Sequence, residues 1–377
     1  MKLLHTSDWH LGIKLKTYDY LPSQREFADW LLKTVEVEKI DVVLVAGDIF
    51  DKGFPPIEAI ELANEIFNQL CALDISVVII SGNHDSAERL NFCSQMMESA
   101  GLYIRTEQRN LNEIGEPIKI ERGGESVCII PIPYLDPTRV IEIGDAERSH
   151  GGLIDAILKS RLKEVADPAK TIVMSHAFVA GGTESDSEKS ISIGGTARVA
   201  IDVYKKFGYV ALGHLHKPQE ISQNIFYSGT PLQYSFSEEH PKSVRVITID
   251  ETIKTHEIKI PIGPRVFTLK DSLENLLKDP KYVTAESHLV RIKLTDKKLL
   301  LNARARLEVR FSNLNDFGYV ETNVGGEYSG STFDLVRLTP DEIIRQYIEA
   351  VHPNVIEPDI DVFIKESVQI ATAAGKE

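Results

Sequence analysis

Residues 41–51 read Asp-Val-Val-Leu-Val-Ala-Gly-Asp-Ile-Phe-Asp, an unbroken apolar run that ends in glycine and aspartate. A continuous run of this kind is typical of a strand that is buried on both faces, as in the sheets of α/β proteins. In such sheets, ligands collect beyond the carboxyl ends of the strands. The stretch therefore predicts an α/β fold in which Asp48 lies at the edge where a site can form.

The same alternation of strands and helices is predicted through the first two-thirds of the chain. Strands are expected at Lys2–His5, Asp41–Ala46, Ser76–Ser81, Val127–Pro131, Thr171–Ser175, Tyr209–Leu212, Ile225–Ser228 and Ser243–Asp250. Helices are expected at Ser23–Glu38, Pro56–Leu70 and Ser86–Ala100, with Ser23 and Glu26 spaced as a capping box. The pattern predicts a layered α/β domain with a sheet core flanked by helices.

The character of the chain changes near Pro261–Pro264, where prolines surround a glycine. We therefore expect a first domain at residues 1–262, a small α/β capping domain at 263–338 and a helical tail at 339–377. Within the capping domain, the sequence predicts a helix at Asp271–Lys278 and strands at Leu289–Leu294 and Ala305–Phe311.

Residues that can bind a divalent cation follow five of the apolar runs. The motifs are Asp8-x-His10, Gly47-Asp48-x-x-Asp51, Gly82-Asn83-His84-Asp85, a lone His176, and Gly213-His214-Leu215-His216. Imidazole, carboxylate and amide groups together suit borderline-hard cations, and two such cations can hydrolyse a phosphoester. Each motif alone has an ordinary explanation as a turn or a surface strand. Their coincidence predicts a hydrolase that acts on phosphate esters.

Taken in order, these motifs resemble the pattern of the calcineurin-like metallophosphoesterase family over roughly residues 1–235. The resemblance implies that Asp48 bridges two divalent metal ions. It implies that Asp8, His10 and His216 bind one ion and that Asn83, His176 and His214 bind the other. Two ions about 3.5–4 Å apart would activate a hydroxide for in-line attack on phosphorus.

The resemblance gives His84 a catalytic role, as proton donor or phosphate contact, rather than a role in metal binding. It implies that Asp51 orients and charges His84, although Asp51 could also be a simple turn residue. We expect His5 to be structural and Trp9 to pack inside the domain rather than to stack on a base.

The residues around the motifs narrow the class further. The stretches MKLLHTSDWHLG, VAGDIFDKGFPP, ISGNHDSAERL, YVALGHLHKPQ and YSGTPLQYSFSE resemble the SbcD family of nuclease subunits through about residue 240. The resemblance implies a Mn²⁺-dependent nuclease with ATP-dependent 3′→5′ exonuclease activity on double-stranded DNA. It also implies endonuclease activity on hairpins and single strands, in DNA repair, replication and recombination.

The resemblance further implies a homodimer within a heterotetramer, in which the partner is an SbcC-type ATPase with a long coiled coil. Dimer contacts are expected between Pro56 and Ala100. Two apolar stripes in the tail are candidates for binding the ATPase: Ile343, Ile344, Tyr347, Ile348 and Val351, then Ile360, Phe363, Ile364 and Val368. These stripes could instead pack on the capping domain. Four basic residues near the motifs could contact DNA or simply face solvent: Lys14, Lys16, Lys52 and Arg89.

The net charge of −14 argues against a free-standing DNA-binding protein, because binding to DNA depends on neutralising phosphates. Bound cations and a basic partner would offset this charge. Two alternatives therefore stay open, a small-molecule phosphodiesterase of the same superfamily and a non-catalytic assembly scaffold. No apolar run approaches the roughly 18 residues of a membrane span, and the first residues lack a signal-peptide core. We expect a cytoplasmic protein without membrane contact.

Overall fold

The computed structural model describes residues 1–140, 146–185, 188, 198–320, 339, 341–342, 344–345, 348 and 358–374. The chain divides into two compact units, Met1–Val266 and Phe267–Glu377. The division falls close to the predicted boundary near Pro261–Pro264. The further separation of a capping domain from a tail stays a prediction.

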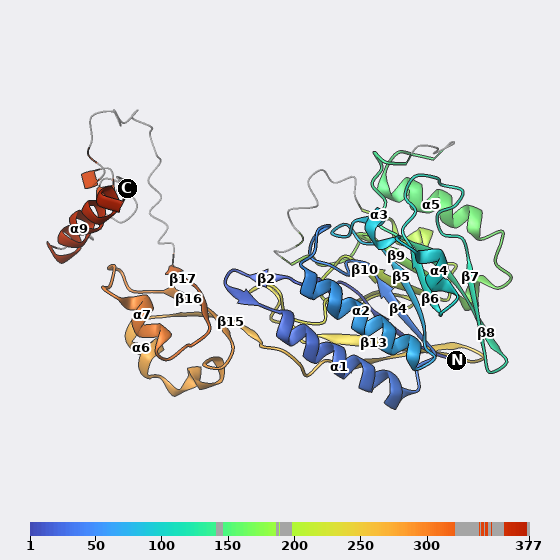
Figure 1. The fold of residues 1–377 in the computed structure, drawn as a ribbon, viewed down its shortest axis with the longest axis horizontal. Coiled ribbons are helices and arrows are strands. Elements are labelled where there is room, and N and C mark those ends of the chain that lie inside the picture. Colours follow the sequence, from blue (N-terminus) through green and yellow to red (C-terminus); the bar gives the residue numbers. More distant parts are fainter. Residues whose placement is uncertain are drawn as a thin grey trace. The chain divides into compact units, whose positions relative to one another are not determined.

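Two six-stranded sheets form the centre of the first unit (Figure 1). In spatial order, the first sheet contains β14 (Ile253–Lys259), β13 (Ser243–Ile249), β1 (Lys2–Thr6), β4 (Val42–Ala46), β5 (Ser76–Ile80) and β6 (Leu102–Arg105). The second contains β11 (Gln219–Ser222), β12 (Ile225–Tyr227), β10 (Tyr209–Gly213), β9 (Thr171–His176), β8 (Glu125–Ile132) and β7 (Ile118–Arg122). All eight strands predicted for this unit are present, but they are shared between two sheets.

The remaining elements of the first unit are helices and short strands. They are β2 (Lys14–Leu15), β3 (Tyr18–Asp19), α1 (Leu21–Glu38), α2 (Ile57–Ala72), α3 (Ala87–Leu90), α4 (Ser94–Glu98) and α5 (His150–Arg161), with 3-10 helices at Pro168–Lys170 and Ile201–Val203. None of the described helices is both long enough and apolar enough to cross a membrane.

Successive side chains of the central strands point to opposite faces of each sheet, and this explains why the first unit has four layers: helices, two sheets and helices. In β4, Leu44 packs between the two sheets, whereas Val43 and Val45 face α1 and α2. In β9, Met174 likewise lies between the sheets and Val173 faces α5. Helices therefore cover the outer face of each sheet, and the predicted layered α/β fold is confirmed.

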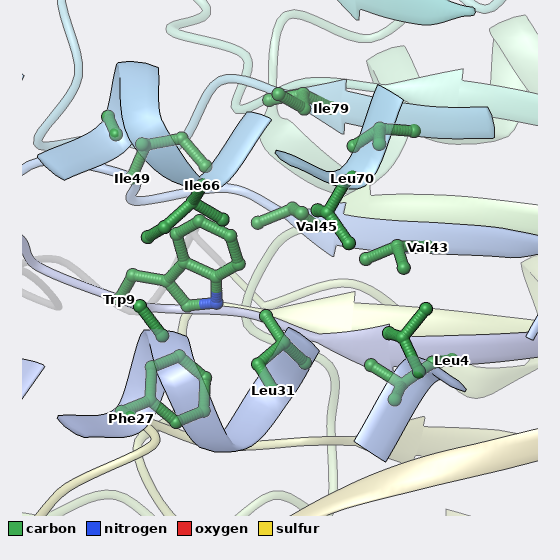
Figure 2. Close-up of a cluster of buried hydrophobic side chains, with 14 of the residues drawn as sticks. Leu4, Trp9, Phe27, Leu31, Val43, Val45, Ile49, Ile66, Leu70 and Ile79 are labelled. Carbon is green, nitrogen blue, oxygen red and sulfur yellow. The ribbon is translucent and has the colours of Figure 1, made fainter. Parts of the chain in front are cut away.

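Trp9 packs inside the first layer of helices, as expected. Its ring stacks on Phe67 of α2 with centroids 5.7 Å apart and meets Phe27 of α1 edge-on at 6.1 Å. The indole Nε1 donates a hydrogen bond to Thr6 Oγ1 at 2.9 Å. Figure 2 shows the indole beside Phe27 and Ile66. The position of Trp9 anchors the loop after β1, which carries Asp8 and His10.

Two details of the predicted helices are wrong. Helix α1 begins at Leu21, so Ser23 is buried in its first turn and makes no capping hydrogen bond there. The segment Ser86–Ala100 is not one helix, because Cys93 adopts a left-handed backbone conformation (φ 59°) between α3 and α4. An L-residue in that conformation interrupts a right-handed helix.

The second unit is built on a three-stranded sheet. Its elements are β15 (Val266–Asp271), α6 (Leu273–Lys278), the 3-10 helix Pro280–Ala285, β16 (Leu289–Leu294), α7 (Ala303–Glu308), β17 (Leu314–Tyr319) and α9 (Pro358–Ala374). The strand predicted at Ala305–Phe311 is wrong. Ala303, Leu307 and Phe311 are buried at intervals of four residues, which is the spacing of a helix face. In the tail, Ile343, Tyr347 and Val351 lie outside the described residues.

Candidate metal centre

All seven predicted ligands lie in loops or strand ends at the carboxyl edges of β1, β4, β5, β9 and β10. Hydrogen bonds join the loops after β1 and β4, since Asp8 N donates to Gly47 O at 2.9 Å and His10 N to Asp48 O at 3.0 Å. The first sheet is joined to the second by His214 N, which donates to Asp8 Oδ1 at 2.9 Å. The site therefore lies where the two sheets meet.

Asp48 lies at the centre of the cluster. Its Oδ2 is 3.7 Å from His10 Nε2 and 3.4 Å from His176 Nε2. Two groups of potential ligand atoms, each within 4.8 Å of one another, include Asp48: one with His10 and His84, the other with Asp8 and His176. A carboxylate shared by two groups is what a bridging ligand requires.

Asn83 lies next to two other predicted ligands, His176 and His214. Its Oδ1 lies 2.9 Å from His176 Nε2 and 2.9 Å from His214 Nδ1. The two imidazole rings meet edge-on with centroids 5.3 Å apart. The amide oxygen and both imidazoles thus converge on one point, as a cation site requires.

His10 supplies a test of whether the cluster fits a metal. Its side chain is 1% exposed, and neither ring nitrogen has a hydrogen-bond partner among the described residues. Buried imidazole nitrogens without partners are costly. The His10 ring faces His216, with centroids 5.0 Å apart. A cation beside the His10 ring would satisfy one of its two nitrogen atoms, so the residues fit a metal centre.

The backbone of the site is strained at the ligands themselves. Asp8, His10 and Asp48 have φ values of 52°, 45° and 50°, and His214 has 106°. Such values are uncommon for residues other than glycine and cost free energy of order 1–3 kcal/mol each. The rest of the fold must offset this cost in free energy to keep the four residues in these conformations.

Glycines beside the ligands allow the close packing. A Cβ atom on Gly47 would lie 2.2 Å from His176 Nδ1, and one on Gly82 would lie 2.1 Å from Asp48 Oδ1. A Cβ on Gly213 would lie 1.8 Å from the Ala46 carbonyl oxygen. No larger residue fits at these positions without moving a ligand, which explains the glycine in three of the motifs.

The ionisation states follow from burial and from contacts within the cluster. Burial raises the pKa of Asp8 to about 6, lowers that of His214 to about 3, and holds that of His10 well below its usual value. Burial also lowers the pKa of His176, but the Asp48 carboxylate outweighs it and raises the value to about 9. Burial would raise the pKa of Asp48, yet the neighbouring imidazoles, His176 first, keep it well below normal. His10 and His214 are thus in the neutral form that binds a metal.

His84 lies beside the centre and contacts Asp51 in an unexpected way. Its Nδ1 is 2.8 Å from the main-chain carbonyl oxygen of Asp51, and its backbone N–H donates to Asp48 Oδ1 at 2.8 Å. The Asp51 carboxylate lies 4.0 Å from His10 Nδ1 instead. The main chain of Asp51, rather than its carboxylate, makes the hydrogen bond to His84.

Two carboxylates that support the site were not predicted. Asp85 accepts hydrogen bonds from the backbone N–H groups of Ile49, Phe50 and Gly82, which joins the loops after β4 and β5. Glu238 is fully buried, and its Oε1 lies 3.0 Å from His216 Nδ1. Both residues occur within the stretches that resemble the SbcD family. The sequence does not show which groups they contact, because those groups are distant in the chain or belong to the backbone.

His5 is structural, as expected. Its ring lies 2.9 Å from the Tyr209 hydroxyl through Nδ1 and 3.1 Å from the Leu212 carbonyl oxygen through Nε2. Burial lowers its pKa to about 3. Both ring nitrogens are thus used to join β1 to β10 across the two sheets.

Comparisons with known proteins show which family the chain belongs to. The calcineurin-like phosphoesterase family matches residues 1–218. The SbcD component of nuclease SbcCD from Staphylococcus epidermidis is 31% identical over 337 residues, covering 85% of this chain and 89% of the relative. The SbcD component from Staphylococcus saprophyticus is 33% identical over 300 residues, covering 78% of each. A solved dimetal phosphatase from Danio rerio shares 11% identity at a TM-score of 0.38, over 70% of this chain and 99% of that one, which is too low to support an argument.

Proposed function

Because the chain belongs to the calcineurin-like phosphoesterase family, and within it to the SbcD nucleases, we propose that it is a metal-dependent DNA nuclease. It would be the nuclease subunit of a complex with an SbcC-type ATPase. The proposed reactions are ATP-dependent 3′→5′ exonuclease cleavage of double-stranded DNA and endonuclease cleavage of hairpins and single strands, in repair, replication and recombination.

One observation carries the proposal: the buried carboxylate of Asp48 lies 3.7 Å from His10 Nε2 and 3.4 Å from His176 Nε2, two histidines that belong to the ligand sets of different ions. We assign Asp8, His10 and His216 to one ion and Asn83, His176 and His214 to the other, with Asp48 between them. Mn²⁺ is the proposed metal, because the resemblance to the SbcD family implies it and the carboxylate and amide oxygens of the site suit it. A bound pair of such ions supplies an activated water and stabilises charge on the phosphate.

His84 is the residue of the chain that would transfer a proton beside that pair of ions. His84 Nδ1 faces a carbonyl oxygen, which can only accept a hydrogen bond, so Nδ1 carries the hydrogen. In the imidazolium form, which carries a hydrogen on both ring nitrogens, the opposite nitrogen Nε2 is the atom that would donate a proton to the departing sugar oxygen, leaving His84 neutral with its hydrogen on Nδ1. Such proton donation contributes roughly 10²–10⁴-fold to a rate. Asp51 acts as a positioning residue through its main chain.

Two exposed apolar surfaces fit the proposed assembly. Ile57 and Ile60 of α2, together with Phe92 and Met96, are 48–76% exposed and form a candidate surface for the homodimer. In the second unit, apolar residues line a hollow of about 350 Å³ that would bind a helix of the ATPase: Leu299, Leu300, Leu301, Ile344, Ile348, Ile360, Phe363 and Ile364. The cytoplasm is the proposed location.

A nuclease assay tests the proposal. End-labelled linear duplex and hairpin DNA would be incubated with the chain and a series of divalent ions, with and without the ATPase partner and ATP. We expect Mn²⁺-dependent shortening from 3′ ends and opening of the hairpin. Brisk hydrolysis of bis(p-nitrophenyl) phosphate with both DNAs left intact would instead identify a small-molecule phosphodiesterase.

A further inference from the structure

Phe54 is a large aromatic side chain that lies exposed beside the candidate metal centre. It is 79% exposed, whereas most aromatic residues of the first unit are buried. It belongs to the loop between β4 and α2, which also contains Asp48 and Asp51. An aromatic ring left in water next to a catalytic centre is an apolar surface that a ligand could cover.

The loop of Phe54 is tied to the loop of His84. A Cβ atom on Gly53 would lie 3.8 Å from the His84 carbonyl oxygen and 3.6 Å from Ser86 Cβ. The Asp51 carbonyl oxygen, 2.8 Å from His84 Nδ1, makes a second connection. The ring of Phe54 is therefore carried by a segment that is fixed relative to the proposed proton donor.

One face of the ring is already covered by a cation. The guanidinium carbon of Arg89 lies 3.5 Å from the ring centroid, and Arg89 Nη1 donates to Gly53 O at 2.9 Å. A cation over an aromatic face adds about 0.5–1 kcal/mol at an exposed site. Because Phe54 precedes Pro55 and Pro56, its backbone is also restricted to extended conformations. The ring is held in place while its other face stays open.

Two lysines lie near the ring, each beside a carboxylate. Phe54 lines a hollow of about 370 Å³ together with Gly12, Lys14, Asp51, Lys52, Pro55 and Pro56. The side chains of Lys14 and Lys52 are 60% and 78% exposed; Lys14 pairs with Asp19 at 2.9 Å, and Lys52 lies 4.0 Å from Asp51. Lysines beside an aromatic ring form the usual combination in sites for unpaired nucleic acid, where the cations follow the backbone and the ring stacks on a base.

We propose that Phe54 stacks on an unpaired base next to the phosphodiester that is cleaved, with Lys14 and Lys52 beside the flanking backbone. The inference rests on the proposed nuclease function and deepens it by assigning Phe54 a contact with the base next to the cleaved bond. Stacking there would hold the flanking nucleotide so that the phosphate reaches the metal centre and His84 Nε2 reaches the sugar oxygen.

The test compares two hairpin DNAs that differ at one position. One has a normal nucleotide beside the cleaved bond, and the other has an abasic residue there. Phe54→Ala should lower kcat/KM on the normal hairpin roughly 5–150-fold, the range that a base–aromatic stack provides. Phe54→Trp should retain activity on it. On the abasic hairpin, the unaltered chain and Phe54→Ala should have the same kcat/KM, because the stacking partner is missing from the DNA.

Val37→Ala serves as the matched control, because Val37 is a 69% exposed apolar residue on α1. It should behave as the unaltered chain on both hairpins. Equal losses of Phe54→Ala on both hairpins, with a shift from dimer to monomer in sedimentation, would overturn the inference and place Phe54 in a contact between copies. No loss on either hairpin would also overturn it. If the unaltered chain cleaved neither DNA, the proposed function itself would fail, which is a different result.

Discussion

The Nδ1 atom of His216 lies 3.0 Å from Oε1 of Glu238, and both side chains are buried. The other carboxylate oxygen of Glu238 accepts a hydrogen bond from Lys242 Nζ at 2.6 Å. Burial would raise the pKa of Glu238, but Lys242 and His216 hold it well below its usual value. The charged carboxylate thus fixes the orientation of the His216 ring, an arrangement that is common behind metal-binding histidines.

Glu238→Gln should weaken metal binding. The amide keeps the shape of the side chain but loses the charge that orients His216, and removal of such a partner typically costs about 10–100-fold in metal affinity. Calorimetric titration with Mn²⁺ measures the change. Glu239→Gln is the control, since Glu239 is the next residue and is exposed. Equal affinities in the two variants would show that Glu238 does not position the ligand.

Asp48→Asn should abolish the binding of both metal ions together. In a bridging role, the Asp48 carboxylate would contact both ions, and an amide would not supply two anionic contacts. Metal content after dialysis against Mn²⁺ reports the stoichiometry. Asp202→Asn, at a side chain that is 80% exposed, should leave it unchanged. Retention of one ion at full affinity in Asp48→Asn would contradict the bridge.

His84→Ala should retain both ions and lose strand cleavage by roughly 10²–10⁴-fold, because it removes the proton donor but none of the assigned ligands. Cleavage of hairpin DNA and metal content would be measured on the same preparation. His256→Ala, on the exposed face of β14, is the control. A parallel fall in metal content and activity would make His84 a ligand instead.

Metal affinity should rise with pH from below 6 to about 9. Burial raises the pKa of Asp8 to about 6, so below that pH the carboxylate is protonated and cannot bind a cation. Burial lowers the pKa of His176, but Asp48 outweighs it and raises it to about 9, so at neutral pH a metal must displace a proton from the imidazole. Titration at pH 7 in buffers of different ionisation enthalpy should reveal proton release. Affinity that stays constant over this range would contradict these ionisation states.

Leu44→Ala should destabilise the first unit by about 2–5 kcal/mol, because Leu44 is fully buried between the two sheets and its removal leaves a cavity. The free energy of unfolding in urea measures the loss. Val37→Ala, at an exposed position, should change it by less than about 0.5 kcal/mol. A similar small effect at Leu44 would mean that the interface between the sheets is loosely packed.

The residues of the site were predictable because each ligand follows an apolar strand, and strands are visible in the sequence as local runs. Two contacts that bring the ligands together were not predictable, because they join residues far apart in the chain. Gly213 is paired with His176 in neighbouring parallel strands, and His214 N donates a hydrogen bond to Asp8 Oδ1. The helix at Ala303–Glu308 was mistaken for a strand because a short segment with few apolar residues fits either period.

The sequence by itself determined the α/β class, the family and the candidate metal ligands, because these depend on residue type, order and local spacing. Only the tertiary structure decided that two sheets pack face to face, that Glu238 supports His216, that the main chain of Asp51 contacts His84, and that Phe54 remains exposed over Arg89. The physical reason is distance along the chain: contacts between residues tens to hundreds of positions apart arise from packing, and packing leaves no local pattern in the sequence.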